Sequence, residues 1–172
     1  MQELVVLVDE ADREIGTAPK LDAHRTGALH RAVSVFLTAG HRDILLQQRA
    51  AGKYHSPGRW SNTCCGHPRA GEDPRAAGSR RLLEEMGIVC NLEPAGKFHY
   101  RADLGHGLTE HEIDHVFVGR WHARPHPDPV EVGAWRWISV ADLEADLAAN
   151  PDTYTAWVSQ ALEVARQHEL LR

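Results

Sequence analysis

The chain has 172 residues, of which 42% are hydrophobic and 25% are charged, and its formal net charge is −5. A chain of this length and composition folds as one domain with a sizeable core, which excludes disorder. The acidic balance excludes the broad basic surface that nucleic acid or an anionic membrane would require. The N-terminus has no pattern of a signal peptide or membrane span, and an odd number of thiols favours a reducing compartment. We therefore expect a cytoplasmic protein whose phosphate binding, if any, is local.

The first predicted element is a short strand over residues 4–8 (LVVLV), which a polar turn separates from Gly16. Residues 32–49 contain two β-rich runs around Gly40 to Asp43 and predict a hairpin. Residues 50–72 are rich in Gly, Pro, Ser and Asn and lack periodicity, which predicts a long loop. Long loops in compact domains are usually functional.

A helix is predicted over residues 74–86. Asp73 is an N-cap acceptor, Pro74 occupies the first helical position, and Gly87 is a natural residue after the C-cap.

Paired strands are predicted next, over residues 97–105 and 108–121. In the second strand Glu110, Glu112 and Asp114 alternate with other residues, so their carboxylates lie on one face. That face is a candidate functional surface.

The C-terminal part predicts a strand over about 134–138 and a helix that starts at Ser139 and stops at Pro151. A last helix is expected over about 155–170. No internal repeat or linker interrupts the chain. The whole pattern predicts one domain, residues 1–172, of the α/β (α+β) class, with a mixed β-sheet and flanking helices.

One constellation has the pattern G-x5-E-x7-R-R-L-L-E-E-M-G-I and resembles the Nudix box, in which glutamates bind a divalent metal at a diphosphate. The matching positions are Gly66, Glu72, Arg80, Glu84, Glu85, Gly87 and Ile88. An isolated pair of glutamates near a helix end is more often a solvated face, but a match at seven positions favours the metal site. Arg81 departs from the box, which has glutamate there. A guanidinium matches phosphate oxygens, so Arg81 favours phosphate binding over metal-driven hydrolysis.

A second constellation consists of histidines and glutamates. Taken singly, a histidine in a chain that has twelve is more often a surface residue than a ligand. Together, three imidazoles and two carboxylates would make a five-ligand site with a sixth position free, suited to Mn2+, Mg2+, Zn2+ or Fe2+. The candidate ligands are His24, His30, His67, Glu110 and Glu112.

Seven segments together resemble the type 1 isopentenyl-diphosphate delta-isomerases, a non-hydrolysing branch of the Nudix superfamily. They are LHRAVSVFL, QQRAAGKYHSPGRWSNTCCGHP, RRLLEEMGI, FHYRA, TEHE, EVGAWRWI and AWVSQAL. The resemblance covers about residues 4 to 171, and its most specific element is NTCCGHP combined with TEHE. It implies a Nudix-like α/β/α sandwich with a core at about 28–165. It also implies interconversion of isopentenyl diphosphate and dimethylallyl diphosphate by movement of a double bond.

Moving a double bond requires an acid and a base on opposite sides of a three-carbon unit. The resemblance assigns this catalysis to Cys65 and Glu112, with Tyr100 accompanying Glu112. We expect Glu112 with Tyr100 to donate the proton and Cys65 to accept one, although the order of these roles is open. The resemblance implies that Trp157 stabilises a carbocation through its π face, and Trp60 is expected to form another wall.

The resemblance also matches phosphate-contacting positions to Lys20, Arg49, Lys53 and Arg81. Mg2+ on Glu85, with the main-chain oxygen of Cys65, would hold the diphosphate. The interval from His24 to His30 is one residue shorter than expected, so the loop between them must adjust if both are ligands. We expect a small-molecule substrate, no nucleic-acid or membrane partner, and a monomer or weak homodimer.

Two other functions remain open at this point. A Nudix hydrolase of a nucleoside diphosphate derivative would use metal-activated water, but Arg81 disfavours it and Cys65 would then have no role. A non-catalytic binding module on the same fold would not need Cys65, Glu112 and five candidate ligands together.

Overall fold

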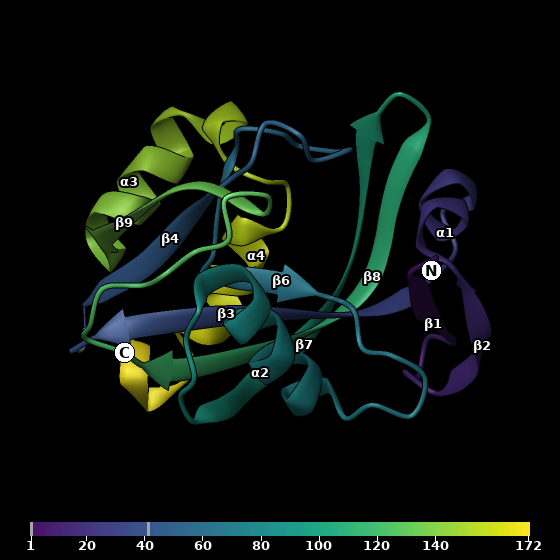
Figure 1. Ribbon diagram of the computed structural model, residues 1–172, viewed down its shortest axis with the longest axis horizontal. Helices are drawn as coiled ribbons and strands as arrows, with labels where there is room; N and C mark the ends of the chain where they lie inside the picture. Colours follow the sequence, from purple (N-terminus) through teal and green to yellow (C-terminus); the bar gives the residue numbers. More distant parts are fainter. Residues whose placement is uncertain (1, 41) are drawn as a thin grey trace.

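A mixed sheet runs through the middle of the computed structural model, which describes residues 2–40 and 42–172 (Figure 1). The strands of the described part are β1 (Leu4–Val8), β2 (Glu14–Pro19), β3 (His30–Ala39), β4 (Asp43–Arg49), β5 (Trp60–Ser61), β6 (Cys64–Gly66), β7 (Leu92–Gly105), β8 (Leu108–Arg120) and β9 (Val132–Ser139). The helices are α1 (Lys20–Thr26), α2 (Pro74–Met86), α3 (Val140–Ala149) and α4 (Val158–Ala165), with short 3-10 turns η1 (Pro151–Thr153) and η2 (Glu169–Leu171).

Strand β3 is the centre of the sheet. It pairs antiparallel with β1, β4 and β6, and parallel with β8, which in turn forms a long antiparallel hairpin with β7. The parallel register places His30 directly opposite Glu112. This pairing brings two predicted site residues together from distant parts of the chain.

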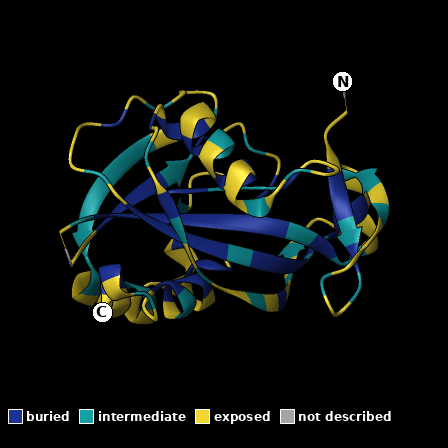
Figure 2. Ribbon diagram, turned by 90° about the horizontal axis from the view of Figure 1, so that it is seen from below, coloured by how far each residue is buried: buried dark blue, intermediate teal, exposed yellow. Residues whose placement is uncertain are grey.

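The sheet buries a separate apolar cluster on each face, which is the consequence of period-2 alternation along its strands. Val35, Leu37 and Phe117 pack with residues of α2 on one face. Phe36 and Val116 pack with residues of α4 on the other face. Figure 2 shows the buried strands between helices whose outer surfaces are exposed. The predicted sandwich with a mixed sheet and flanking helices is confirmed.

The adjacent cysteines follow the same alternation. Cys64 is fully buried in the α2-side cluster, whereas Cys65 is only partly buried and packs against the α4-side cluster. The two thiols therefore face opposite sides of the sheet, as expected for neighbours on a strand.

Helix α2 has the predicted bounds because its ends are determined locally. The Asp73 side chain accepts hydrogen bonds from the backbone N–H groups of Arg75 and Ala76, and Pro74 is the first helical residue. At the other end Gly87 is in the left-handed region, at φ 66°. These are the capping features that end a helix without tertiary help.

Replacing Gly87 with alanine should destabilise the protein by about 1–3 kcal/mol, since a left-handed residue other than glycine is strained. The added Cβ would also lie 2.5 Å from the main-chain oxygen of His126. The free energy of unfolding in urea measures the loss. Gly71→Ala is the matched control, because Gly71 has φ +73° and open space around it. Equal losses in the two variants would show that the approach to His126 has no energetic effect.

The segment 50–72 is not the uninterrupted loop that its composition predicts. It contains β5 and β6, which pair with β4 and β3. Strands of two and three residues are too short to show periodicity in a sequence, and here their pairing is a tertiary effect.

Three other parts of the chain differ from expectation. Strand β2 and helix α1 were not predicted, and the last helix, expected over 155–170, is limited to α4 and is followed by η2. The predicted turn between β3 and β4 includes His41, which lies outside the described residues. Within residues 2–40 and 42–172, no helix combines the length and the apolar character that crossing a membrane requires.

Candidate active site

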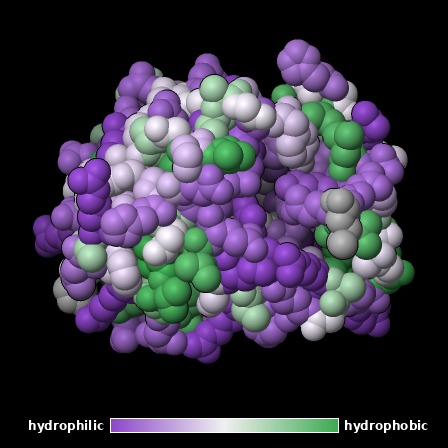
Figure 3. Space-filling model, viewed as in Figure 1, coloured by the Kyte–Doolittle hydropathy of each residue, from purple (hydrophilic) through white to green (hydrophobic). Residues whose placement is uncertain are grey.

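A cleft near the middle of the molecule gathers most of the predicted site residues. Figure 3 shows a hollow there that is bordered mostly by hydrophilic side chains. The predicted residues that line the cleft are Lys20, Arg49, Lys53, Cys65, His67, Arg81, Glu85, Glu110, Glu112 and Trp157. The other three, His24, His30 and Tyr100, are buried and contact the glutamates of the cleft.

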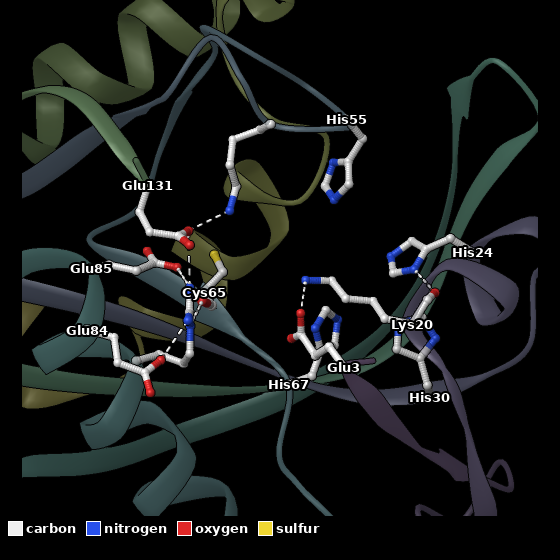
Figure 4. A network of polar contacts seen from close by, with 12 residues as sticks. Glu3, Lys20, His24, His30, His55, Cys65, His67, Glu84, Glu85 and Glu131 are labelled. Atoms are coloured by element: carbon white, nitrogen blue, oxygen red, sulfur yellow. Dashed lines mark hydrogen bonds and ion pairs between the residues drawn. The ribbon is translucent and has the colours of Figure 1, made fainter. Parts of the chain in front are cut away.

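Histidine and glutamate side chains converge at one end of the cleft. One ligand atom from each of His24, His30, His67 and Glu112 lies within 4.8 Å of the others. The Nε2 atoms of His30 and His67 are each 3.1 Å from the same carboxylate oxygen of Glu112. His24 Nε2 is 3.8 Å from Glu110 Oε1. All five candidate ligands are thus brought together, with the histidines turned toward one region in Figure 4.

The outer nitrogens of two histidines are held by backbone carbonyls. His24 Nδ1 is 2.7 Å from the carbonyl oxygen of Lys20, and His30 Nδ1 is 2.8 Å from that of Ala28. Because a carbonyl only accepts, each Nδ1 carries a proton, and Nε2 is the ring atom that faces the carboxylates. His24 Nε2 and His67 Nδ1 have no hydrogen-bond partner among the described residues. Imidazole nitrogens and carboxylate oxygens that converge in a buried site suit a divalent cation.

The backbone accounts for this convergence. Helix α1 ends at Gly27, whose left-handed conformation (φ 67°) turns the chain toward β3. This tight turn accommodates the short interval from His24 to His30, so both rings reach the cluster. Glu110 and Glu112 project from the same face of β8, as their spacing predicts.

The pKa values of the two glutamates are shifted in opposite directions. Burial and the charge of Glu112 raise the pKa of Glu110. Burial alone would also raise the pKa of Glu112, but hydrogen bonds with His30 and His67 hold it well below the usual value. The Tyr100 hydroxyl donates to Glu110 and lies 3.3 Å from Glu112 Oε2. The tyrosine hydroxyl therefore joins the two carboxyl groups.

The Cys65 thiol lies elsewhere in the same cleft. It is 3.2 Å from Asn62 Oδ1, and the indole N–H of Trp157 donates to its sulfur at 3.1 Å. Burial raises the pKa of Cys65 to about 12, with further contributions from Asp114 and Glu85. The thiol is therefore protonated near neutral pH unless the negative charge of Asp114 or Glu85 is neutralised or the site is opened to water.

Arg81 joins the residues expected at the diphosphate. Its Nη2 is 2.5 Å from Glu85 Oε1 and 3.3 Å from Glu131 Oε2, and Lys53 Nζ is 2.5 Å from the same Glu131 oxygen (Figure 4). The Arg81 Nε also approaches the main-chain oxygen of Cys65, at 3.5 Å. The Arg81 guanidinium thus contacts both groups expected to hold Mg2+, the Glu85 carboxylate and the main-chain oxygen of Cys65.

Gly66 and the Nudix-like box shape this part of the cleft. A Cβ on Gly66 would lie 2.4 Å from Arg81 Cγ, so only glycine lets the arginine side chain pass. Arg80 Nε contacts Glu72 at 2.8 Å, and Arg80 Nη2 donates to the main-chain oxygen of His67 at 3.1 Å. The matched pair Glu72 and Arg80 therefore fixes the loop that presents His67.

The expectation for Trp60 is wrong. The Arg136 guanidinium lies over the Trp60 ring, 4.4 Å from the ring centroid. The ring packs against the α4-side core and is not among the residues that line the cleft.

Two of the cations expected at the diphosphate have other partners in this structure. Arg49 lies 5.8 Å from the Trp157 ring centroid, and Lys20 pairs with Glu3 at 3.1 Å.

Sequence reasoning assigned no role to Glu3, Ser34, His55 and Asp114, which line the cleft, or to Glu131, which contacts Arg81. Asp114 is buried and accepts from the Ser34 hydroxyl at 2.6 Å; only its place on the carboxylate face of the strand signals it. Glu131 and His55 come from loops, and nothing in their spacing distinguishes them. Burial, followed by the charge of Arg49, lowers the pKa of His55 to about 2, so its ring is neutral.

Comparisons with known proteins identify the family of the chain. The family model described as the NUDIX domain matches residues 28–158. A protein of Nocardia farcinica named isopentenyl-diphosphate Delta-isomerase is 52% identical and aligns over 94% of this chain and 93% of its own length. Isopentenyl-diphosphate Delta-isomerase 2 of Aromatoleum aromaticum is 49% identical, over 95% and 86%.

Solved structures show the same fold at lower identity. A protein of Deinococcus radiodurans aligns with a TM-score of 0.77 at 24% identity, covering 96% of this chain and 99% of the other. The MutT protein of Methanosarcina mazei aligns with a TM-score of 0.65 at 22% identity, covering 81% and 94%. With the NUDIX match over most of its length and full-length relatives at about half identity, the chain belongs to the isopentenyl-diphosphate Delta-isomerase family.

Proposed function

We propose that this chain interconverts isopentenyl diphosphate and dimethylallyl diphosphate by adding a proton to one carbon and removing one from another. The observation that carries the proposal is a single cleft lined by a thiol, Cys65, and by the carboxyl pair of Glu110 and Glu112 with its tyrosine. Hydrolysis by activated water would leave the thiol of this pair without a role.

The proton donor in this proposal is the group formed by Tyr100 and the two glutamates. Because the pKa of Glu110 is raised and that of Glu112 is lowered, Glu110 is the carboxyl group that more readily holds a proton, and it shares a hydrogen bond with the tyrosine hydroxyl. Glu112, whose oxygens contact His30 and His67, keeps a fixed orientation while the proton moves. Protonation of the alkene at its terminal carbon then leaves positive charge on the tertiary carbon.

Cys65 accepts the second proton and must be a thiolate when it does so. Glu85 contributes to the raised pKa of the thiol, so neutralising that carboxylate by a cation would lower it toward the working pH. The reverse reaction starts from the protonated thiol, so both forms of Cys65 take part. The Trp157 indole, whose N–H reaches the sulfur, offers a π face to the positive charge that develops between the two groups.

The buried His and Glu cluster fits Mn2+, Mg2+ or Zn2+, held by His24, His30, His67, Glu110 and Glu112. When bound, the ion supplies positive charge that stabilises the ionised carboxylate. Glu85 and the main-chain oxygen of Cys65 fit Mg2+ together with diphosphate oxygens. Lys20, Arg49, Lys53 and Arg81 supply the remaining positive charge for the diphosphate.

We also propose that residues 1–172 act as one domain in the cytoplasm, as a monomer or weak homodimer without a nucleic-acid or membrane partner. The free thiols of Cys64, Cys65 and Cys90 suit a reducing compartment. The net charge of −5 disfavours polyanionic partners.

The test incubates the purified protein with isopentenyl diphosphate and Mg2+ and follows dimethylallyl diphosphate and released phosphate separately. We expect isomer without phosphate. Phosphate release from a nucleoside diphosphate derivative, without any isomer, would favour the hydrolase instead. Pretreatment with a chelator should abolish turnover, and added Mg2+ with Mn2+ should restore it.

A further inference from the structure

His55 is a buried imidazole for which the reaction described above has no use. It lies in the loop between β4 and β5, has 7% of its surface exposed, and points toward the His and Glu cluster (Figure 4). Its Nε2 is 3.7 Å from Glu110 Oε1. Ligand atoms of His24, His55 and Glu110 all lie within 4.8 Å of one another, as a second group that shares His24 with the first.

The position of His55 is fixed by contacts on several sides. Its main-chain oxygen accepts from Arg49 Nε at 3.3 Å and Nη2 at 3.1 Å. The ring stacks on His24 with centroids 5.7 Å apart and meets the Trp157 ring edge-on at 6.1 Å. A ring held in this way is placed for a specific contact rather than left at a loop tip.

The two ring nitrogens of His55 have different neighbours. Nδ1 lies 3.4 Å from the Ser56 hydroxyl oxygen, and Nε2 is the ring nitrogen that faces Glu110. Ser56 itself has a left-handed backbone (φ 49°), a conformation that costs about 1–3 kcal/mol in a residue other than glycine. The loop thus accepts strain next to the histidine, as segments at functional sites do.

We propose that His55 is a sixth protein ligand of the divalent ion, joining the three histidines and two glutamates assigned above. The inference rests on the proposed His and Glu site and deepens it. Six protein donors would leave no position for water or substrate on an ion that takes six ligands. Such an ion would hold the ligands in place and supply charge without contacting the substrate.

A second consequence concerns the loop that carries His55. The same loop carries Lys53, which lies at the proposed diphosphate end of the cleft, with its Nζ against Glu131. An ion bound to His55 would tie this loop to β8. Occupancy of the His and Glu site would therefore also fix a phosphate-contacting lysine.

The test counts the water molecules bound directly to Mn2+, from the broadening of its paramagnetic resonance signal in 17O-enriched water. Glu85→Gln is the background throughout, because it removes the second proposed ion site. We expect no bound water in this background and one after the further change His55→Ala. We also expect His55→Ala to weaken Mn2+ binding by at least about 10-fold. A loss of this size is the smallest that follows when even a residue that only hydrogen-bonds a metal ligand is removed.

His99→Ala is the matched control, because His99 is an exposed histidine on β7 that contacts only His111 among the described histidines. It should leave both the water count and the Mn2+ affinity unchanged. One or more water molecules bound to Mn2+ in the Glu85→Gln background, where His55 is present, would overturn the inference. This result does not depend on any His55 variant. An unchanged affinity and water count in His55→Ala overturns it too. If either result is found and His30→Ala loses Mn2+ binding, the ion still binds at the His and Glu site, and only the role of His55 is excluded.

Discussion

Replacing Cys65 with alanine should lower kcat for isomerisation by about 10²–10⁴-fold, the range that a general acid or base contributes. The thiol is one of two proton-transfer groups in the cleft, and the alanine methyl group that replaces it beside Asn62 and Trp157 cannot accept a proton. KM should change little, because the cations proposed to bind the diphosphate are untouched. Steady-state kinetics with isopentenyl diphosphate measure both constants.

Cys64→Ala is the matched control, since it removes the neighbouring thiol from the α2-side core. It should lower stability and leave kcat nearly unchanged. Cys65→Ser should be almost as inactive as the alanine variant, because a hydroxyl ionises far less readily than a thiol. Full activity in Cys65→Ala would remove Cys65 from the mechanism while leaving the family assignment intact.

Replacing Glu112 with glutamine should lower kcat by at least as much, about 10²–10⁴-fold, and should also weaken binding of Mn2+. One oxygen of Glu112 faces both His30 and His67, and the other faces Tyr100. A neutral amide of the same shape keeps the packing but removes the negative charge that these contacts stabilise. Kinetics and the Mn2+ dissociation constant are the two measurements.

Glu93→Gln serves as the control for Glu112, because Glu93 is a carboxylate of β7 that pairs with His168 outside the cleft. It should change neither measurement. A normal Mn2+ affinity in Glu112→Gln, together with a large loss of kcat, would separate proton transfer from ion binding. A normal kcat would exclude Glu112 as a catalytic group.

The fold could be predicted best where structure is determined locally. Helix α2 has the expected bounds because Asp73, Pro74 and Gly87 act within their own turns. Strands β5 and β6 could not be predicted, since two or three residues carry no period and their pairing partners lie elsewhere in the chain. The parallel pairing of β3 with β8 was also invisible, because it depends on how the whole sheet is assembled.

The candidate site could also be predicted only in part. The family motifs identified the cysteine, the histidines and the glutamates. The two-residue repeat of a β-strand predicted that Glu110 and Glu112 share one face. His55 and Glu131 could not be found, because each sits in a loop whose path decides what the side chain reaches. Trp60 was expected to form an aromatic wall of the cleft, but its ring lies against Arg136 instead.

The parallel pairing that sets His30 against Glu112 has a thermodynamic consequence. These residues are separated by 82 positions, so no short fragment contains the ion site, and the unfolded chain cannot bind an ion as the native one does. An ion that binds only the native state adds to the free energy of unfolding, by about 2.7 kcal/mol at a concentration 100 times Kd. The melting temperature should therefore rise with the concentration of the ion, so part of the stability of the folded enzyme depends on the supply of metal.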